Sequence, residues 1–419
     1  MSRSSVRFFI LLSLGLAWFL GRDLGHAAEL KPRIYTLEEI IKIVLEHNPA
    51  ITGAEGGVEQ SLGRKQAAGA YLNPTFNGTA GRGSIRDPST GVSITERTFT
   101  VEQPLEWLGK RTARKQVAEA GVAGAQAAVE ETRLDVIAET KTAFYSMLLA
   151  QRRTELATDN VTMMDKLIEL VKVRVASGDA TRFELMKTEV EGLKVRQELT
   201  RARSRIIIAR AELGALTAGT LGADFLVEGE FLAFEEPPSV QTIIGRAREQ
   251  HPTIRRLQRQ VEQAGYQVVH EEESRIPNVT ISGQYHREAG DESVTAGLSV
   301  PVPVWYRQQG EITAALGAKR RAEAELIRIQ AGLAKALTQE MQEVRVAKEQ
   351  IGVFEEGFLK QAQRTVQIAR ASFEQGYTAL LDLLDAQRVY RQTQYDYAQA
   401  RFDLATALVR LERSAGGSL

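Results

Sequence analysis

Apolar positions in the last quarter of the chain predict one very long helix. They recur at steps of three, four and seven between Leu326 and Phe373, and this spacing marks a single buried stripe. No proline follows Pro303, so we expect the helix to run without interruption to Gly376. Roughly 68 residues make a helix about 100 Å long. The pattern resumes beyond Gly376, so residues 307–413 predict a long helical hairpin that cannot bury its stripe alone.

The first half of the chain repeats this organisation. Residues 108–216 carry a second long helical pattern, which turns at Gly178. Three landmarks recur at nearly constant spacing: Pro49 and Pro252 lie 203 positions apart, Trp107 and Trp305 lie 198 apart, and Gly178 and Gly376 also lie 198 apart. We interpret the two halves as an internal duplication, with too few copies for a solenoid.

Between the short and the long helices the apolar period changes to two. Residues 277–303 alternate cleanly around a turn at Gly290-Asp291, which predicts a β-hairpin. The equivalent residues 75–103 alternate more weakly, are richer in Gly and Thr, and contain a surface loop at 86–91.

Four such strands, each with one apolar and one polar face, match the strands of a membrane β-barrel. A soluble sheet with one wet face would show the same pattern. Four strands cannot close a barrel, and an open edge is not tolerated in lipid, so a barrel requires several chains. Three copies would supply twelve strands, which lies within the size range of bacterial outer-membrane barrels.

The ends of the chain and the region between the repeats complete the predicted organisation. Residues 1–28 resemble a secretory signal peptide, because basic residues precede an apolar run that is too short to favour the alternative, a membrane anchor. The first repeat then spans 29–218 and the second spans 239–413. We expect 219–238 to be a connector packed outside the long helices, and 414–419 to be disordered.

Composition narrows the classes of function. Lys and Arg number 53, as do Asp and Glu, and a formal net charge of zero gives no reason to expect nucleic acid as a partner. The chain has no cysteine, so an exported form would have neither disulfides nor a lipid-modified cysteine. The histidines of the mature chain show no metal-ligand spacing, and no phosphate loop or nucleophile elbow is present. We expect no cofactor, no bound metal and no catalysis.

The mature chain resembles the TolC-type outer-membrane efflux proteins. The resemblance lies in the Thr36–Glu39 opening, the Asn-Pro helix break, the paired strands, the duplicated hairpins and, most specifically, the second turn from Gly376 to Gln387. The segments Gln103–Arg111 and Val300–Glu311 are similar to the CzcC-like heavy-metal branch. The resemblance implies a mainly α-helical fold whose homotrimer forms a twelve-stranded β-barrel in outer-membrane lipid and an α-helical barrel in the periplasm of a Gram-negative bacterium. It also implies docking onto a membrane-fusion adaptor and an inner-membrane RND-type pump.

The resemblance also assigns candidate site residues near the two turns. Asp382 and Asp385 share a helix face, and in the family these positions form a ring of carboxylates at the periplasmic constriction. Glu184 occupies the position of Asp382 in the first repeat. Arg182 could replace an arginine that the family places where this chain has Thr378. The candidate docking residues for the adaptor are Gly178, Gly376, Phe373 and Tyr377. The alternative is solvated charges near helix N-termini and turns that merely need glycine.

The leading hypothesis is a passive exit duct of a tripartite efflux pump. A periplasmic coiled-coil scaffold without a pore is the alternative, but a scaffold does not require strands with an apolar face. An outer-membrane enzyme is a third alternative, and it lacks a catalytic constellation. Divalent heavy-metal cations are favoured as substrates over drugs or secreted peptides only through the resemblance.

Overall fold

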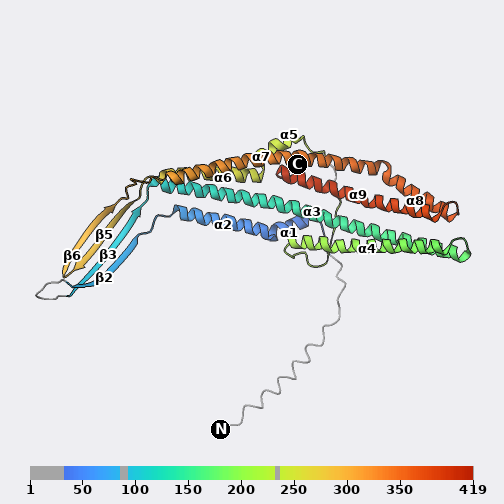
Figure 1. Cartoon of the computed structure of the whole chain (residues 1–419), viewed down its shortest axis with the longest axis horizontal. Helices are drawn as coiled ribbons and strands as arrows, with labels where there is room; N and C mark the ends of the chain where they lie inside the picture. The colour runs from blue at the N-terminus through green and yellow to red at the C-terminus, as the bar shows by residue number, and fades with distance from the viewer. Residues whose placement is uncertain (1–32, 85–92, 232–235, 419) are drawn as a thin grey trace, which may run out of the picture.

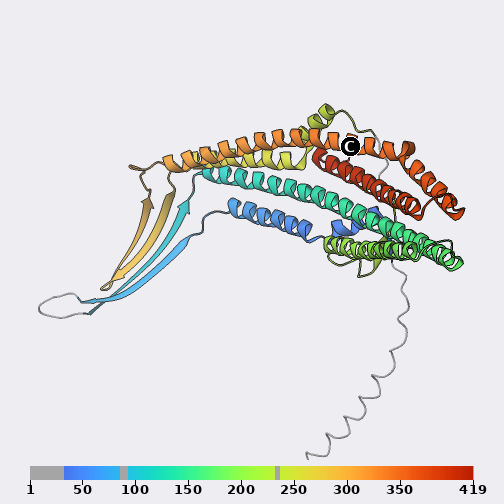
Figure 2. The same cartoon turned by 45° about the vertical axis from the view of Figure 1, so that its right-hand side comes forward.

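The protein is an elongated molecule with a β-sheet at one end and helical turns at the other (Figures 1 and 2). The computed structural model describes residues 33–84, 93–231 and 236–418. The predicted signal peptide, the loop at 86–91 and Leu419 lie outside these residues. No helix within the described ranges combines the length and the apolar character needed to cross a membrane.

Both repeats have two short helices, two strands and a long helical hairpin in the same order. The first comprises β1 Arg33–Tyr35, α1 Leu37–His47, α2 Pro49–Gly69, β2 Thr75–Ser84, β3 Ser93–Leu105, α3 Leu108–Ser177 and α4 Arg182–Leu216. The connector contributes β4 Phe225–Val227. The second comprises α5 Val240–Gln250, α6 Pro252–Glu273, β5 Val279–Glu288, β6 Asp291–Ser299, α7 Gln309–Val353, a π-helical turn Phe354–Phe358, α8 Leu359–Glu374 and α9 Leu380–Ala415.

Equivalent positions of the two repeats are buried in the same way. Ile40, Val44 and Ile51 of the first repeat correspond, 203 positions later, to Ile243, Ala247 and Ile254 of the second, and all six are buried. In both repeats the short helices therefore pack through the same stripe, which supports the duplication inferred from the sequence.

The two hairpins form one antiparallel sheet in the order β2-β3-β5-β6. The β3–β5 ladder joins the repeats, pairing Glu96 with Glu288 at one end and Leu105 with Val279 at the other. Phe76, Phe99 and Tyr285 stack across three strands on one face, with ring centroids 6.2 and 6.5 Å apart. In the single chain β2 and β6 pair on one side only, so the sheet has two open edges.

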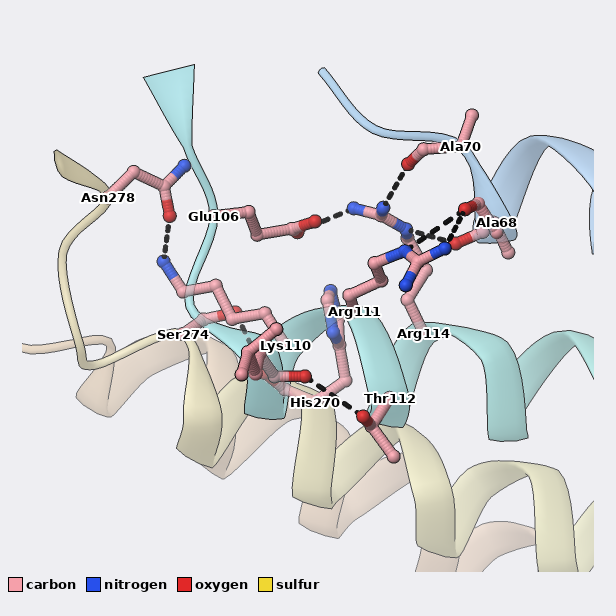
Figure 3. Close-up of polar contacts among 12 residues, drawn as sticks. Ala68, Ala70, Glu106, Lys110, Arg111, Thr112, Arg114, His270, Ser274 and Asn278 are labelled. Carbon is pink, nitrogen blue, oxygen red and sulfur yellow. Dashed lines mark hydrogen bonds and ion pairs between the residues drawn. The ribbon is translucent and has the colours of Figure 1, made fainter. Parts of the chain in front are cut away.

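The start of α3, directly after β3, is basic and holds the end of α2 (Figure 3). The Arg111 guanidinium donates to the carbonyl of Gly69 at 2.7 and 3.0 Å, and Arg114 donates to the carbonyls of Ala68 and Ala70. Arg114 also pairs with Glu106 at 2.6 Å. The last carbonyls of a helix lack partners within the helix and carry partial negative charge, so cationic side chains stabilise this end.

One polar residue in each repeat ties a short helix to the end of a long one. Asn48 begins α2 by accepting from the Ala50 amide at 2.9 Å, and its amide nitrogen donates to the Leu216 carbonyl at the end of α4. His251 does the same for α6: Nδ1 accepts from the Thr253 amide, and Nε2 lies 3.2 Å from the Arg413 carbonyl near the end of α9. This arrangement requires a neutral imidazole with its proton on Nε2.

The expectation of an uninterrupted helix up to Gly376 was wrong in one place. The hydrogen-bonding pattern widens to a π turn at Phe354–Phe358, and in Figures 1 and 2 the chain bends there toward α9. The ring of Phe354 lies 5.8 Å from that of Phe358 and 5.9 Å from that of Tyr397, whose hydroxyl donates to Glu355. The contacts with Tyr397 of α9 stabilise the irregular turn. The bend therefore forms without a proline.

The expectation of a disordered tail was also wrong, whereas the connector needs contacts with the long helices to be ordered. The connector packs against the long helices, because Phe225 is fully buried in the largest core and Phe231 stacks on Tyr145 of α3. The first residues of the tail belong to α9 and its cap. Ser414 donates to Glu340, and a left-handed Gly416 ends the helix against His251. Tertiary contacts, rather than local sequence, order both segments.

The tie made by His251 predicts a pH-dependent stability. Burial lowers the pKa of His251 below its ordinary 6.5, despite the opposing effect of its hydrogen bond to the Arg413 carbonyl; the charged groups around it are Glu131, Asp135 and Arg413. Below pH 6.5 the unfolded chain therefore binds more protons than the folded chain. The stabilisation is complete above this pH and decreases as the pH falls toward the lower pKa of the folded state. His251→Ala should cost about 1–2 kcal/mol at pH 8, measured as thermal unfolding by circular dichroism.

His251→Asn is the matched control, because asparagine performs the equivalent role at position 48. It should retain most of the stability at pH 8, and its stability should decrease less than that of the wild type on acidification. An alanine variant as stable as the wild type would contradict the role assigned to His251.

Candidate functional site

The two helical turns lie together at the end of the molecule away from the sheet (Figure 1). Gly178 and Gly376 end α3 and α8 in the left-handed conformation, with φ of 86° and 82°. In each turn the amide after the glycine donates back to a carbonyl five residues earlier, Asp179 to Arg174 and Tyr377 to Ser372, both at 2.8 Å. This bonding satisfies the free carbonyls of the helix end, and it requires a residue that tolerates positive φ.

An apolar cluster joins the two turns. Its buried members come from α3, α4, α8 and α9: Met164, Leu167, Ile168, Val171, Val195, Phe373, Leu380, Leu383 and Leu384. Phe373 is only 4% exposed, so the prediction that it offers a docking contact is wrong for this structure; its role is to pack the two hairpins together. Tyr377 is 81% exposed at the point of the second turn, as a docking residue must be.

Arg174 links the turns more directly than any residue selected from the sequence. Its guanidinium donates to the Phe373 carbonyl at 2.8 Å and lies over the Phe373 ring, 4.7 Å from the centroid. The guanidinium therefore stabilises the end of α8 and makes a cation–π contact with the Phe373 ring. The position of Arg174, four residues before Gly178, was the available signal, but sequence alone does not show which chain segment it reaches.

The two candidate carboxylates of α9 have different surroundings. Asp382 and Asp385 are both exposed and lie on one helix face, opposite the buried Leu383. Asp385 forms an ion pair with Arg388 one turn later. Asp382, in the first turn of α9, forms no side-chain hydrogen bond or ion pair with any other described residue. Asp382 is thus an uncompensated negative charge at the turn, whereas Asp385 is partly neutralised.

The first-repeat candidates are less suited to a ring of charges. Glu184 accepts from the Thr181 amide at 2.7 Å, while the Thr181 hydroxyl accepts from the Glu184 amide. This capping box occupies the Glu184 carboxylate, and Thr-x-x-Glu could have been recognised at this position as it was at Thr36–Glu39. Arg182 is exposed at the start of α4 and contacts neither candidate aspartate in the described chain.

A groove of about 380 Å³ separates the two hairpins beside these residues. Lys187 and Lys194 line it from α4, and Asp385 and Arg388 line it from α9. Across the described residues, no group of three or more His, Cys, Asp or Glu side chains is arranged to hold a metal ion. The site is therefore a charged, solvent-facing helical end with a rigid apolar interior.

Comparisons with known proteins agree with this architecture. Among curated proteins, the chain is 24% identical over 383 residues to the cobalt-zinc-cadmium resistance protein CzcC of Cupriavidus metallidurans, covering 91% of this chain and 90% of that protein. It is 24% identical over 322 residues to the nickel and cobalt resistance protein CnrC of the same organism, covering 76% and 75%.

Solved structures show the same fold. The chain superposes on CusC with a TM-score of 0.79 at 14% identity, covering 94% of this chain and 96% of that one. It superposes on the outer membrane channel CmeC of Campylobacter jejuni with a TM-score of 0.78 at 16% identity, covering 91% and 86%. The expected TolC-type architecture, with a duplicated strand pair and long helical hairpin, is confirmed.

A family model described as outer membrane efflux protein matches residues 40–219 and 243–417. The two matched segments coincide with the two structural repeats and together cover most of the sequence. The chain therefore belongs to the outer membrane efflux protein family.

Proposed function

We propose that three copies of this chain form a passive exit duct in the outer membrane, serving a periplasmic adaptor and an inner-membrane RND-type pump. The observation that carries the proposal is the open four-stranded sheet. One of its faces exposes large apolar side chains, among them Phe76, Val294 and Leu298 at 67, 81 and 71%. Neither the apolar face nor the two edges are compatible with a water-soluble monomer.

Closure through the edges explains both features. If β6 of one copy pairs with β2 of the next, three sheets give twelve strands with no open edge, and the apolar faces meet lipid. The helices then continue the duct on one side of the membrane. A pore-free scaffold, the competing function, gives no reason for a sheet with these properties.

Divalent heavy-metal cations are the substrates we propose. The support is the names of the two relatives, which are resistance proteins for cobalt, zinc and cadmium and for nickel and cobalt. The exposed carboxylates of α9 are consistent with cation passage, because a ring of like charges raises the local concentration of counter-ions. The duct itself performs no chemistry in this proposal.

The number of copies in the assembly is tested by measuring its mass. Detergent-extracted protein should cross-link to three copies and show a trimer mass by light scattering, because the sheet edges need partners. A stable, water-soluble monomer would contradict the proposal.

The turn at Gly376 tests adaptor docking. Gly376→Val should strain a backbone with φ of 82°, costing about 1–2 kcal/mol locally and displacing the exposed Tyr377. Metal tolerance of cells carrying the cognate pump and adaptor should fall, while the trimer still forms. Gly376→Asn is the control, because asparagine tolerates the left-handed region, and it should retain more export. Equal export by both variants and the wild type would remove this turn from the docking surface.

Asp382 and Asp385 test the constriction. In planar bilayers, replacing both by Ala should weaken cation selectivity and block by divalent ions, with little effect on folding because both side chains are exposed. Asp382→Asn should have the larger effect of the two single substitutions, since Arg388 already partly neutralises Asp385. Arg388→Gln should act in the opposite direction and strengthen selectivity. Unchanged selectivity in the double variant would show that these carboxylates do not line the pore.

A further inference from the structure

The apolar face of the sheet ends in a row of arginines, at the end away from the helices. The strand register places Arg97 of β3 directly opposite Arg287 of β5. Arg82 of β2 lies one row further out on the same face, opposite Thr95. All three arginines are exposed.

This row begins where the aromatic residues stop. Phe99 lies opposite Tyr285 and precedes the Arg97–Arg287 pair by two residues along each strand, and successive residues on one face are two apart. Arg97 to Leu105 spans about 27 Å along the strand at 3.4 Å per residue. On a strand tilted by about 40° this length covers roughly 21 Å across the membrane, which is most of the apolar band of about 25 Å in an outer-membrane barrel. The arginines therefore lie at the level of lipid headgroups, just beyond an aromatic girdle.

The opposite face of the sheet carries the opposite charge at the same level. There Glu96 pairs in register with Glu288, and Glu288 with Asp291. His286 lies beside them, with Nδ1 2.9 Å from the Thr98 hydroxyl. The three arginines thus lie on the apolar, outward face, where Glu292 opposite Arg287 is the one acidic side chain at this level among the described residues, whereas Glu96, Glu288 and Asp291 lie on the polar face.

The arginines are poorly compensated within the chain. Like charges directly opposite each other in adjacent strands destabilise a sheet, as for Arg97 and Arg287. Arg287 has one ionic contact, with Glu292 at 3.3 Å, and both side chains of that pair are more than half exposed. Arg82 and Arg97 form no ion pair with any other described residue. An anion bound from outside would relieve the repulsion.

We propose that Arg97 and Arg287, flanked by Arg82, bind the phosphate groups of a phosphorylated glycolipid in the outer leaflet around the barrel. Guanidinium groups bind phosphate through two parallel hydrogen bonds, and the acyl chains would lie along the adjoining apolar face. The inference rests on the proposed placement in the outer membrane, because the end of the sheet away from the helices faces outward only there. Three copies of the chain would carry three such sites.

The test uses purified trimer in mixed micelles with diphosphorylated lipid A, with bound lipid measured by native mass spectrometry. The double variant Arg97→Gln, Arg287→Gln should bind lipid A at least about tenfold more weakly than the wild type, because each basic residue near a charged lipid surface contributes to binding. Dephosphorylated lipid A should bind the wild type and the variant equally. Millimolar inorganic phosphate should not displace the lipid, since the acyl chains contribute to its affinity.

Two control variants test whether lipid A binding depends on these arginines or on the charge of the protein in general. Arg203→Gln, Arg345→Gln removes two exposed arginines from the long helices α4 and α7 and should leave lipid A binding unchanged. Glu96→Gln, Glu288→Gln alters the polar face at the same level and should also leave it unchanged. Equal loss in the Arg203, Arg345 variant, or displacement by inorganic phosphate, would overturn the inference.

Failure of this inference is distinguishable from failure of the proposed function. Each preparation is first tested for trimer mass and for insertion into lipid vesicles. If the wild type neither trimerises nor inserts, the outer-membrane placement fails. If it inserts but the Arg97, Arg287 variant binds lipid A as well as the wild type, only the glycolipid site is contradicted.

Discussion

The β3–β5 ladder is the interaction on which the rest of the structure depends. Each repeat alone would offer a two-stranded hairpin, which is marginal in water, and a long helical pair with an unburied stripe. Pairing β3 with β5 fixes the two repeats at one end. At the other end, Arg174 of the first repeat holds the Phe373 carbonyl of the second. Helices of this length need ties at both ends because a small change of angle at one end displaces the other by many ångströms.

Duplication gave the chain two equivalent halves, and the structure shows where they have diverged. Asn48 and His251 perform the same capping, but only the histidine can gain a positive charge on acidification. The α3 helix is continuous, whereas its counterpart is divided by the π turn at Phe354–Phe358. The bend brings α8 toward α9, so the second hairpin curves at its end while the first runs straighter (Figure 2). The two turns consequently present unlike surfaces, with Tyr377 exposed on one of them.

Periodicity and spacing were enough to predict the order of elements, the strand pairs and both turns, because each rests on local rules. Alternation at 277–303 becomes β5 and β6, and the glycines at 178 and 376 adopt the left-handed conformation that ends a helix. The π turn, the ordered tail and the particular contacts of the connector, such as Phe231 on Tyr145, depend on segments that are distant in the sequence, which no local pattern contains. Among the candidate site residues, the burial of Phe373 depends on packing between the two hairpins, whereas the capping role of Glu184 is local and is visible in the Thr-x-x-Glu spacing.

Both ends of the molecule present exposed acidic side chains. Acidic groups occur on the polar face at the outer end of the strands, as Glu96 and Glu288, and again beside the helical turn, as Asp382. Alternation in a strand sends every second side chain to the same face, so a shift of one residue in β3 would exchange Glu96 for Arg97 on the polar face. The register of the β3–β5 ladder therefore fixes the sign of the charge that each face presents. If the polar faces line a duct, a cation meets negative charge where it enters and where it leaves, and the same ladder keeps the arginines away from its path.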